Sequence, residues 1–197
     1  RERSHYASVE HVWFLSARRT SARISSLRSL DVDDYDPKEQ FIYIRERDET
    51  QLKNGKQGER PVALSDETCA ILNDYIDQNR TEVTDEHGRN PLISSAHGRV
   101  HRNTMRRWSY KLTCPAFRGE ECECESQRNS KQAYKCDESV SPHGIRRGSS
   151  THFLREGMPE KVVSDRANVS ESVLEKHYDS RTEMEKMNQR RSYLDNI

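Results

Sequence analysis

The sequence has few apolar residues and no long apolar run. Only 31% of the 197 residues are hydrophobic, whereas 34% are charged. No stretch approaches the roughly 20 consecutive apolar residues that a membrane-spanning helix needs, and no signal peptide is recognisable. These absences argue against a membrane protein and predict an intracellular, cytoplasmic location. The apolar residues that are present recur periodically, which argues against global disorder.

The sequence also lacks an excess of charge and an initial methionine. It carries 33 basic and 33 acidic residues, so its formal net charge is zero. A basic face for nucleic acid would therefore have to be balanced by acidic residues elsewhere. Arginine outnumbers lysine, which favours bidentate phosphate contacts but is equally well explained by genomic composition. Because the chain opens on Arg1-Glu-Arg3, we interpret it as part of a longer protein.

Hydrophobic periodicity predicts a mainly α fold with one small antiparallel β-sheet. Phe41 to Ile44 is rich in β-branched and aromatic residues, and Pro61 to Leu64 is its expected partner after the turn signal Asn54-Gly55. Residues 81–101 are expected to be loop with a short extended piece, and 114–140 form an insert rich in cysteine and glutamate. Helices are expected at 5–19, 22–30, 66–79, 101–112, 142–156, 160–167, 170–178 and 181–194.

Short motifs along the chain supply the groups that hold and attack a phosphodiester. Ser141-Pro-His143-Gly-Ile-Arg146 places a histidine and an arginine three residues apart, on one face of a helix. Thr20-Ser-Ala-Arg23 supplies a second arginine. Arginine clamps two phosphate oxygens with a planar fork. The later Tyr178 offers an oxygen that can form a covalent phosphotyrosyl bond.

This arrangement resembles the tyrosine recombinase (phage integrase) family, whose pattern is Arg, a hairpin Lys, His-x-x-Arg, His or Trp, and Tyr. The resemblance implies that the catalytic-domain fold covers 1–197 and that a DNA-clamping domain precedes residue 1. It implies that Arg23 and Arg146 clamp the scissile phosphate and that Tyr178 attacks it. His143 would bind a phosphate oxygen or shuttle a proton. Ser21 replaces the family's usual glycine and Ser26 its usual glutamate.

The lysine of the pattern has two candidates. Lys53 lies just before the predicted turn, where the family carries a general acid toward the leaving 5′ oxygen. Lys56 is three residues farther on. The nucleophile has one late rival, Tyr193.

The family often has Leu-Gly-His at the position of its pattern between His-x-x-Arg and Tyr, here called the third position, and this motif is absent from the sequence. Counting forward from Arg146 leads to Asn168, which could donate a hydrogen bond to a phosphate oxygen. Alternatively, Asn168 N-caps the next helix, with Glu171 completing a capping box. Counting back from Tyr178 leads instead to Val169, which could not do this chemistry.

A basic helix and a cysteine cluster complete the set of candidate sites. The helix is expected to contact DNA phosphates through five basic residues: Arg99, Arg102, Arg106, Arg107 and Lys111. The alternative is that these residues form a solvated helix face. The insert contains four cysteines that could close a tetrahedral zinc site: Cys114, Cys122, Cys124 and Cys136. The alternatives are a disordered insert with thiols, or disulfides, which an intracellular setting disfavours. Such an insert before Ser141 also resembles archaeal, especially haloarchaeal, integrases of viruses or mobile elements.

The resemblance implies a site-specific recombinase or integrase that works through a 3′-phosphotyrosyl intermediate, without a catalytic metal or other cofactor. Its expected partners are double-stranded DNA and further copies of itself in a tetramer. Residues 181–194, with Met184, Met187 and Leu194 at helical spacing, could pass to a neighbouring subunit. A type IB topoisomerase uses the same residues, and a non-catalytic DNA-binding protein of this fold is a further alternative.

Overall fold

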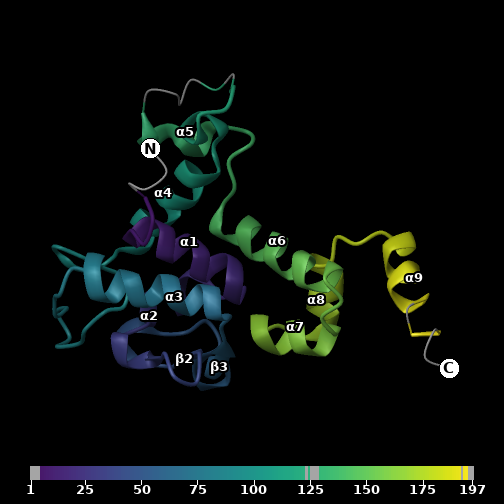
Figure 1. Cartoon of the computed structure of the whole chain (residues 1–197), viewed down its shortest axis with the longest axis horizontal. Coiled ribbons are helices and arrows are strands. Elements are labelled where there is room, and N and C mark those ends of the chain that lie inside the picture. Colours follow the sequence, from purple (N-terminus) through teal and green to yellow (C-terminus); the bar gives the residue numbers. More distant parts are fainter. Residues whose placement is uncertain (1–4, 123, 125–128, 192, 195–197) are drawn as a thin grey trace.

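The computed structural model describes residues 5–122, 124, 129–191 and 193–194. It is mostly helical, with small antiparallel sheets, and the strands of the larger sheet lie beside the N-terminal helices (Figure 1), so the predicted fold class is confirmed. Residues 123 and 125–128 of the expected insert, and residue 192 of the expected last helix, lie outside the described residues. No helix among the described residues is both long and apolar enough to span a membrane.

Local caps set the bounds of the N-terminal helices. α1, Val9–Thr20, begins later than predicted. Ser8 is its N-cap, because the Ser8 side chain accepts a hydrogen bond from the backbone N–H of His11 and so fixes the first turn of the helix. α2 spans Ile24–Ser29. α3, Asp66–Asp74, starts at the N-cap Ser65 and continues as a π-helical turn, Tyr75–Asn79, as the predicted 66–79 helix requires.

The main sheet has three antiparallel strands in the order β1-β2-β3: Tyr35–Asp36, Phe41–Ile44 and Arg60–Ala63. The predicted two-residue hairpin turn at Asn54-Gly55 is wrong. Residues 45–59 join β2 to β3 instead, with 3-10 turns at Asp48–Thr50 and Gly55–Gly58. Leu52 is buried in the main core, so its burial holds this long loop against the body.

The middle of the chain adds two short strands and a long helix. β4 is Ser94–Ser95 and β5 is Gly98–Arg99, just after the extended piece that was expected. α4 spans Arg102–Thr113, close to the predicted 101–112. The described part of the insert contains α5, Pro115–Arg118, and a 3-10 segment, Ser130–Lys135, that packs on α4.

The C-terminal helices agree with prediction to within a few residues. They are α6, Pro142–Arg155; α7, Glu160–Ala167; α8, Glu171–His177; and α9, Glu183–Arg191. In Figure 1, α6 runs from the body of the molecule into a smaller lobe with α7 and α8, while α9 stands apart at the end.

Two apolar clusters define the body and the smaller lobe. The larger cluster includes Trp13, Leu27, Ile44 and Leu72 and gathers side chains from the N-terminal helices and the sheet. The smaller cluster contains Leu154, Val163, Leu174 and Tyr178. Tyr178 belongs to the smaller cluster, and the neighbours of Arg23, Ala22 and Ile24, belong to or pack against the larger one. The candidate site therefore forms where the two clusters meet.

Candidate active site

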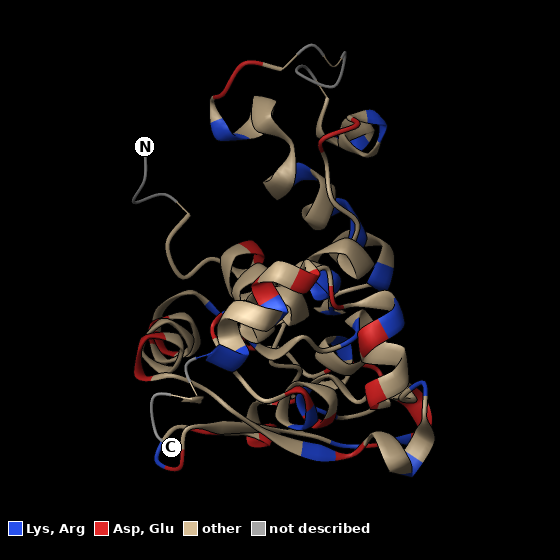
Figure 2. Cartoon of the chain, turned by 90° about the vertical axis from the view of Figure 1, so that its right-hand side faces the viewer, with Lys and Arg blue, Asp and Glu red and all other residues tan. Residues whose placement is uncertain are grey.

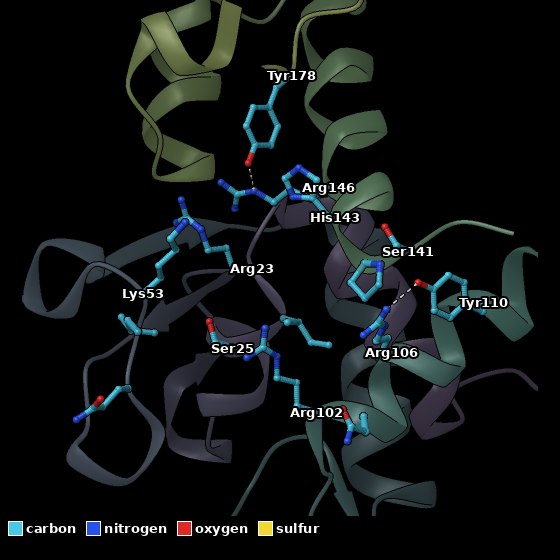
Figure 3. Close-up of a pocket in the computed structure, with 15 residues that line it drawn as sticks. Arg23, Ser25, Lys53, Arg102, Arg106, Tyr110, Ser141, His143, Arg146 and Tyr178 are labelled. Atoms are coloured by element: carbon cyan, nitrogen blue, oxygen red, sulfur yellow. Dashed lines mark hydrogen bonds between the residues drawn. The ribbon is translucent and has the colours of Figure 1, made fainter. Parts of the chain in front are cut away.

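A pocket of about 790 Å³ gathers most of the predicted catalytic side chains. Figure 3 shows these side chains converging from separate parts of the chain. The pocket is lined by Arg23, Lys53, Arg102, Arg106, Tyr110, Ser141, His143, Arg146 and Tyr178, with six further residues. Lys56 and Asn168 are not part of its wall.

Tyr178 directs its hydroxyl toward a guanidinium. It follows α8 and is only 6% exposed, since its ring packs in the apolar cluster of the smaller lobe. The hydroxyl oxygen accepts a hydrogen bond from Arg146 Nε at 3.4 Å (Figure 3). The Tyr178 carbonyl accepts another from Thr151 Oγ1 at 2.5 Å. The His143 ring stands edge-on to the tyrosine ring, with 5.5 Å between centroids. The phenol oxygen therefore lies beside the groups that would hold a phosphate.

Arg146 is buried at 2% exposure and is held by two backbone carbonyls. Its Nη1 donates to Ser21 O at 2.5 Å, and its Nη2 donates to Ala167 O at 2.6 Å. Burial lowers the pKa of this guanidinium, with a further contribution from the charge of Arg23. Ser21 has a left-handed backbone, φ 52°, which explains why the family pattern has glycine at this position.

His143 lies in the first turn of α6. That turn is capped by Ser141, whose Oγ accepts from Gly144 N at 3.1 Å, and Pro142 starts the helix. Desolvation lowers the pKa of His143, and the nearby positive charges, with Arg146 the strongest, lower it further. The imidazole is therefore mainly neutral at pH 7, with one nitrogen able to accept a proton and the other to donate a hydrogen bond.

Two arginines that no sequence motif indicated, Arg60 and Arg166, lie beside the site. Burial and the charges of Arg146, Arg23 and Arg166 lower the pKa of Arg60 to about 10. Its Nε donates to Arg166 O at 2.9 Å. The only sequence signal was the position of Arg60 directly before the predicted strand Pro61 to Leu64, and this does not distinguish it from a surface arginine.

Asn168 adopts a left-handed conformation, φ 51°, and is the C-cap of α7. The alternative that it N-caps the next helix is wrong, because Ser170 fills that position and its side chain accepts from Val173 N. Asn168 O accepts from Arg23 Nη1 at 3.1 Å. Val169 packs against the apolar cluster of the smaller lobe.

The basic helix divides into residues that face the pocket and residues that do not. Arg102 and Arg106 line the pocket, and Arg107 is exposed. The prediction that Arg99 contacts DNA is wrong, because its side chain lies on β5 at 3% exposure and pairs with Asp31 and Asp85. Buried between two carboxylates, it cannot reach a phosphate.

Lys111, at the far end of this helix, pairs with Glu10 at 2.9 Å. Over the whole fold, basic and acidic residues are interspersed along the ribbon (Figure 2).

The four cysteines of the insert come together at the end of α4. Their sulfur atoms all lie within 4.8 Å of one another. The Sγ atoms of Cys114 and Cys124 are 3.8 Å apart, those of Cys122 and Cys136 are 3.6 Å apart, and those of Cys122 and Cys124 are 2.9 Å apart. No disulfide joins any of the chain's cysteines, all of which are described.

The segment after Tyr178 is attached by polar contacts. Gln189 Nε2 donates to Leu154 O at 2.7 Å, and Arg155 pairs with Glu185 at 2.9 Å. α9 buries no side chain, and Met184 is 64% exposed. Tyr193 is 65% exposed and lines a separate hollow between α9 and the end of α6, so it lies outside the candidate active site.

Comparisons with known proteins identify similar folds and a family. The structure of XerA recombinase matches with a TM-score of 0.68 and 19% identity, over 97% of this chain and 57% of that one. Tn1549 transposon integrase in complex with circular intermediate DNA matches with a TM-score of 0.64 and 15% identity, over 93% of this chain and 59% of that one. This chain thus spans under two thirds of either structure. No curated protein matches it. The model of the phage integrase family matches residues 4–182, and the chain therefore belongs to the phage integrase family of tyrosine recombinases.

Proposed function

We propose that residues 1–197 form the catalytic domain of a site-specific DNA recombinase that acts inside the cell. The supporting observation is the Tyr178 hydroxyl, which lies 3.4 Å from Arg146 Nε in a pocket that also contains Arg23, Lys53 and His143. A phenol is a poor nucleophile at neutral pH because its pKa is about 10. Guanidinium groups around a bound phosphate stabilise the charge that develops as the oxygen attacks.

The proposed reaction exchanges one phosphodiester for another. The Tyr178 oxygen bonds to phosphorus and gives up its proton, and His143, whose ring stands edge-on to the tyrosine ring and whose pKa is lowered, is the proposed acceptor. The bond from phosphorus to the 5′ oxygen breaks, and Lys53 gives that oxygen a proton. A 3′-phosphotyrosyl bond and a 5′-hydroxyl result. Attack by another strand's 5′-hydroxyl reverses the step, so the chain's own residues suffice for the chemistry.

A covalent trapping experiment tests this function. A duplex with a nick close to the cleavage site loses its short 5′-hydroxyl fragment after attack, so the phosphotyrosyl complex should accumulate and survive denaturation. A protein that only binds DNA gives no such complex. A topoisomerase of this mechanism gives the complex but also relaxes supercoiled DNA as a monomer, without paired sites.

The pocket rim supplies a surface for the DNA backbone. Arg102 and Arg106 on α4 face the same pocket as Tyr178, and Arg107 is exposed beside them. Arginines contribute mainly phosphate contacts, which position DNA without reading its sequence. We therefore place the DNA across the pocket, between α4 and the loop that carries Lys53.

We also propose that the protein works as a tetramer on DNA in which α9 passes to a neighbouring subunit. α9 has no buried side chain among its described residues, and the contacts that hold it to its own chain include the hydrogen bonds of Gln189 and Arg155. A short helix of this kind is marginal without a partner surface. The exposed Met184, Tyr193 and Leu194 supply the apolar area for such a partner.

Deleting residues 183–197 should impair assembly of paired sites and recombination by about tenfold or more, while binding to a single site changes little, because phosphate contacts dominate binding. Native gels with one-site and two-site DNA measure both effects. A truncated protein that recombines as well as the full chain would show that α9 has no role between subunits.

We propose that Cys114, Cys122, Cys124 and Cys136 hold a structural zinc ion. Zinc bonded to four thiolates at about 2.3 Å places sulfurs about 3.8 Å apart at the corners of a tetrahedron. The 3.8 Å and 3.6 Å pairs match this spacing, and the 2.9 Å pair would open on binding. The surrounding apolar cluster is small, and half of its members are these cysteines, so the insert needs a further stabilising element.

Elemental analysis of the purified protein should find about one zinc per chain. Cys136→Ser should lose the metal and increase protease cleavage within the insert, whereas Cys69→Ser, which alters a cysteine of the main core, should keep it. A protein that resists proteolysis equally well without metal would contradict the proposal.

A further inference from the structure

The C-terminal end of α7 presents three consecutive carbonyls to three arginines. Arg166 O accepts from Arg60 Nε at 2.9 Å, Ala167 O accepts from Arg146 Nη2 at 2.6 Å, and Asn168 O accepts from Arg23 Nη1 at 3.1 Å. The last carbonyls of a helix have no partner within the helix and carry partial negative charge. The end of α7 therefore gathers both arginines of the proposed phosphate clamp.

The side chain of Asn168 reaches in a different direction, to the loop between β2 and β3. Its Oδ1 accepts from Asn54 Nδ2 at 2.6 Å, and its Nδ2 donates to Gln57 O at 2.8 Å. Both polar ends of the amide are thus engaged by the loop, and the residue is not part of the pocket wall. A direct bond from this amide to a phosphate would require breaking these contacts.

Lys53 lies between the two points where the loop is anchored. Its preceding neighbour, Leu52, is buried at 6% exposure in the main core, and the side chain of its following neighbour, Asn54, is hydrogen-bonded to the side chain of Asn168. The two anchors fix the backbone on each side of the lysine. Asn168, which makes the contact with this loop, has a left-handed backbone, a conformation that asparagine tolerates better than most residues.

We propose that Asn168 is a positioning residue that ties the Lys53 loop to the arginine cluster, so that the general acid and the phosphate clamp keep one relative geometry. This inference rests on the proposed function of Lys53. It gives Asn168, one of the two residues that count to the family's third position, a role that acts through the lysine and not on the phosphate.

The role of Lys53 suggests a DNA substrate that distinguishes a defect acting through the lysine from a defect in phosphate binding. An oxygen leaving group needs a proton as its bond to phosphorus breaks. A sulfur atom in the bridging 5′ position leaves as a thiolate, whose conjugate acid has a pKa of about 8.5, and needs no general acid. A defect that acts through the lysine should therefore disappear on the sulfur-containing DNA, whereas a defect in phosphate binding should remain.

The experiment measures single-turnover cleavage of matched oxygen and sulfur substrates by the full chain. Asn168→Gly keeps the left-handed backbone accessible and removes the amide, and Asn54→Ala removes the other side of the contact. Both should slow cleavage of the oxygen substrate by about 10- to 100-fold, a part of the roughly 10²- to 10⁴-fold that a positioned general acid contributes. Both should be within a few-fold of the native protein on the sulfur substrate.

Three control variants make the outcome decisive. Lys53→Ala should be slow on oxygen and recover on sulfur, and Lys53→Ala/Asn168→Gly should be no slower than Lys53→Ala alone. Lys56→Ala, an exposed change in the same loop, should behave as the native protein. If Lys53→Ala fails to recover on the sulfur substrate, Lys53 is not the general acid, and the proposed function of this residue is wrong. If Lys53→Ala recovers but Asn168→Gly does not, or if Asn168→Gly is never slow, the positioning role of Asn168 is overturned.

Discussion

Replacing Tyr178 with phenylalanine is expected to abolish covalent linkage to DNA and to leave DNA binding nearly unchanged. The substitution removes the attacking oxygen, and loss of a covalent nucleophile lowers rates by on the order of 10⁶-fold in a well-studied hydrolase. The phenyl ring still fills its place among Leu154, Val163 and Leu174, so the lobe should remain folded. Binding depends mainly on phosphate contacts, to which one hydroxyl adds little.

A nicked substrate, with the protein resolved on a denaturing gel, measures the covalent product, and a native gel measures binding. Tyr193→Phe is the matched control and should form the covalent complex as the native chain does, because Tyr193 lies outside the candidate active site. Covalent complex in the Tyr178→Phe variant, or its loss only in the Tyr193→Phe variant, would show that Tyr178 is not the nucleophile.

The second large effect is expected for Arg146→Lys, which keeps the positive charge but loses the planar fork. Arg146 donates to Ser21 O and Ala167 O through two different nitrogens while its Nε faces Tyr178. An ammonium cannot reproduce this geometry. Cleavage should slow by about 100- to 1000-fold, as it does when a transition-state charge loses one donor.

Arg146→Lys should also lower stability, because a buried carbonyl without its partner costs about 1–3 kcal/mol. Arg23→Lys should slow cleavage similarly with a smaller loss of stability, since Arg23 is only partly buried. Single-turnover rates alongside thermal unfolding separate the two contributions. Near-normal cleavage by a folded Arg146→Lys protein would remove this residue from the active site.

Local signals in the sequence were sufficient for most of the fold. The cap Ser141 and the helix-starting Pro142 act on their immediate neighbours, so the start of α6 could be predicted from adjacent residues. The same is true of α3 after Ser65. β1 was missed because a two-residue strand has no periodicity of its own and exists only through its pairing with β2.

Charge composition misled in one place for a physical reason. Arg99 belongs to a basic segment of the sequence, yet its partners, Asp31 and Asp85, lie 68 and 14 residues away in the chain. Whether a cation faces solvent or pairs in the interior depends on where distant carboxylates lie, and no local pattern contains that information.

The sequence by itself determined the order of the motifs, their placement on helix starts and ends, and hence the family, because these features depend on neighbours a few residues apart. Only the tertiary structure decided which lysine of the loop faces the pocket and that Arg60 joins the arginine cluster. It alone showed that the amide of Asn168 reaches Asn54, 114 residues away. These contacts arise where the two lobes and the loop meet, so they depend on packing between segments that are distant in the chain.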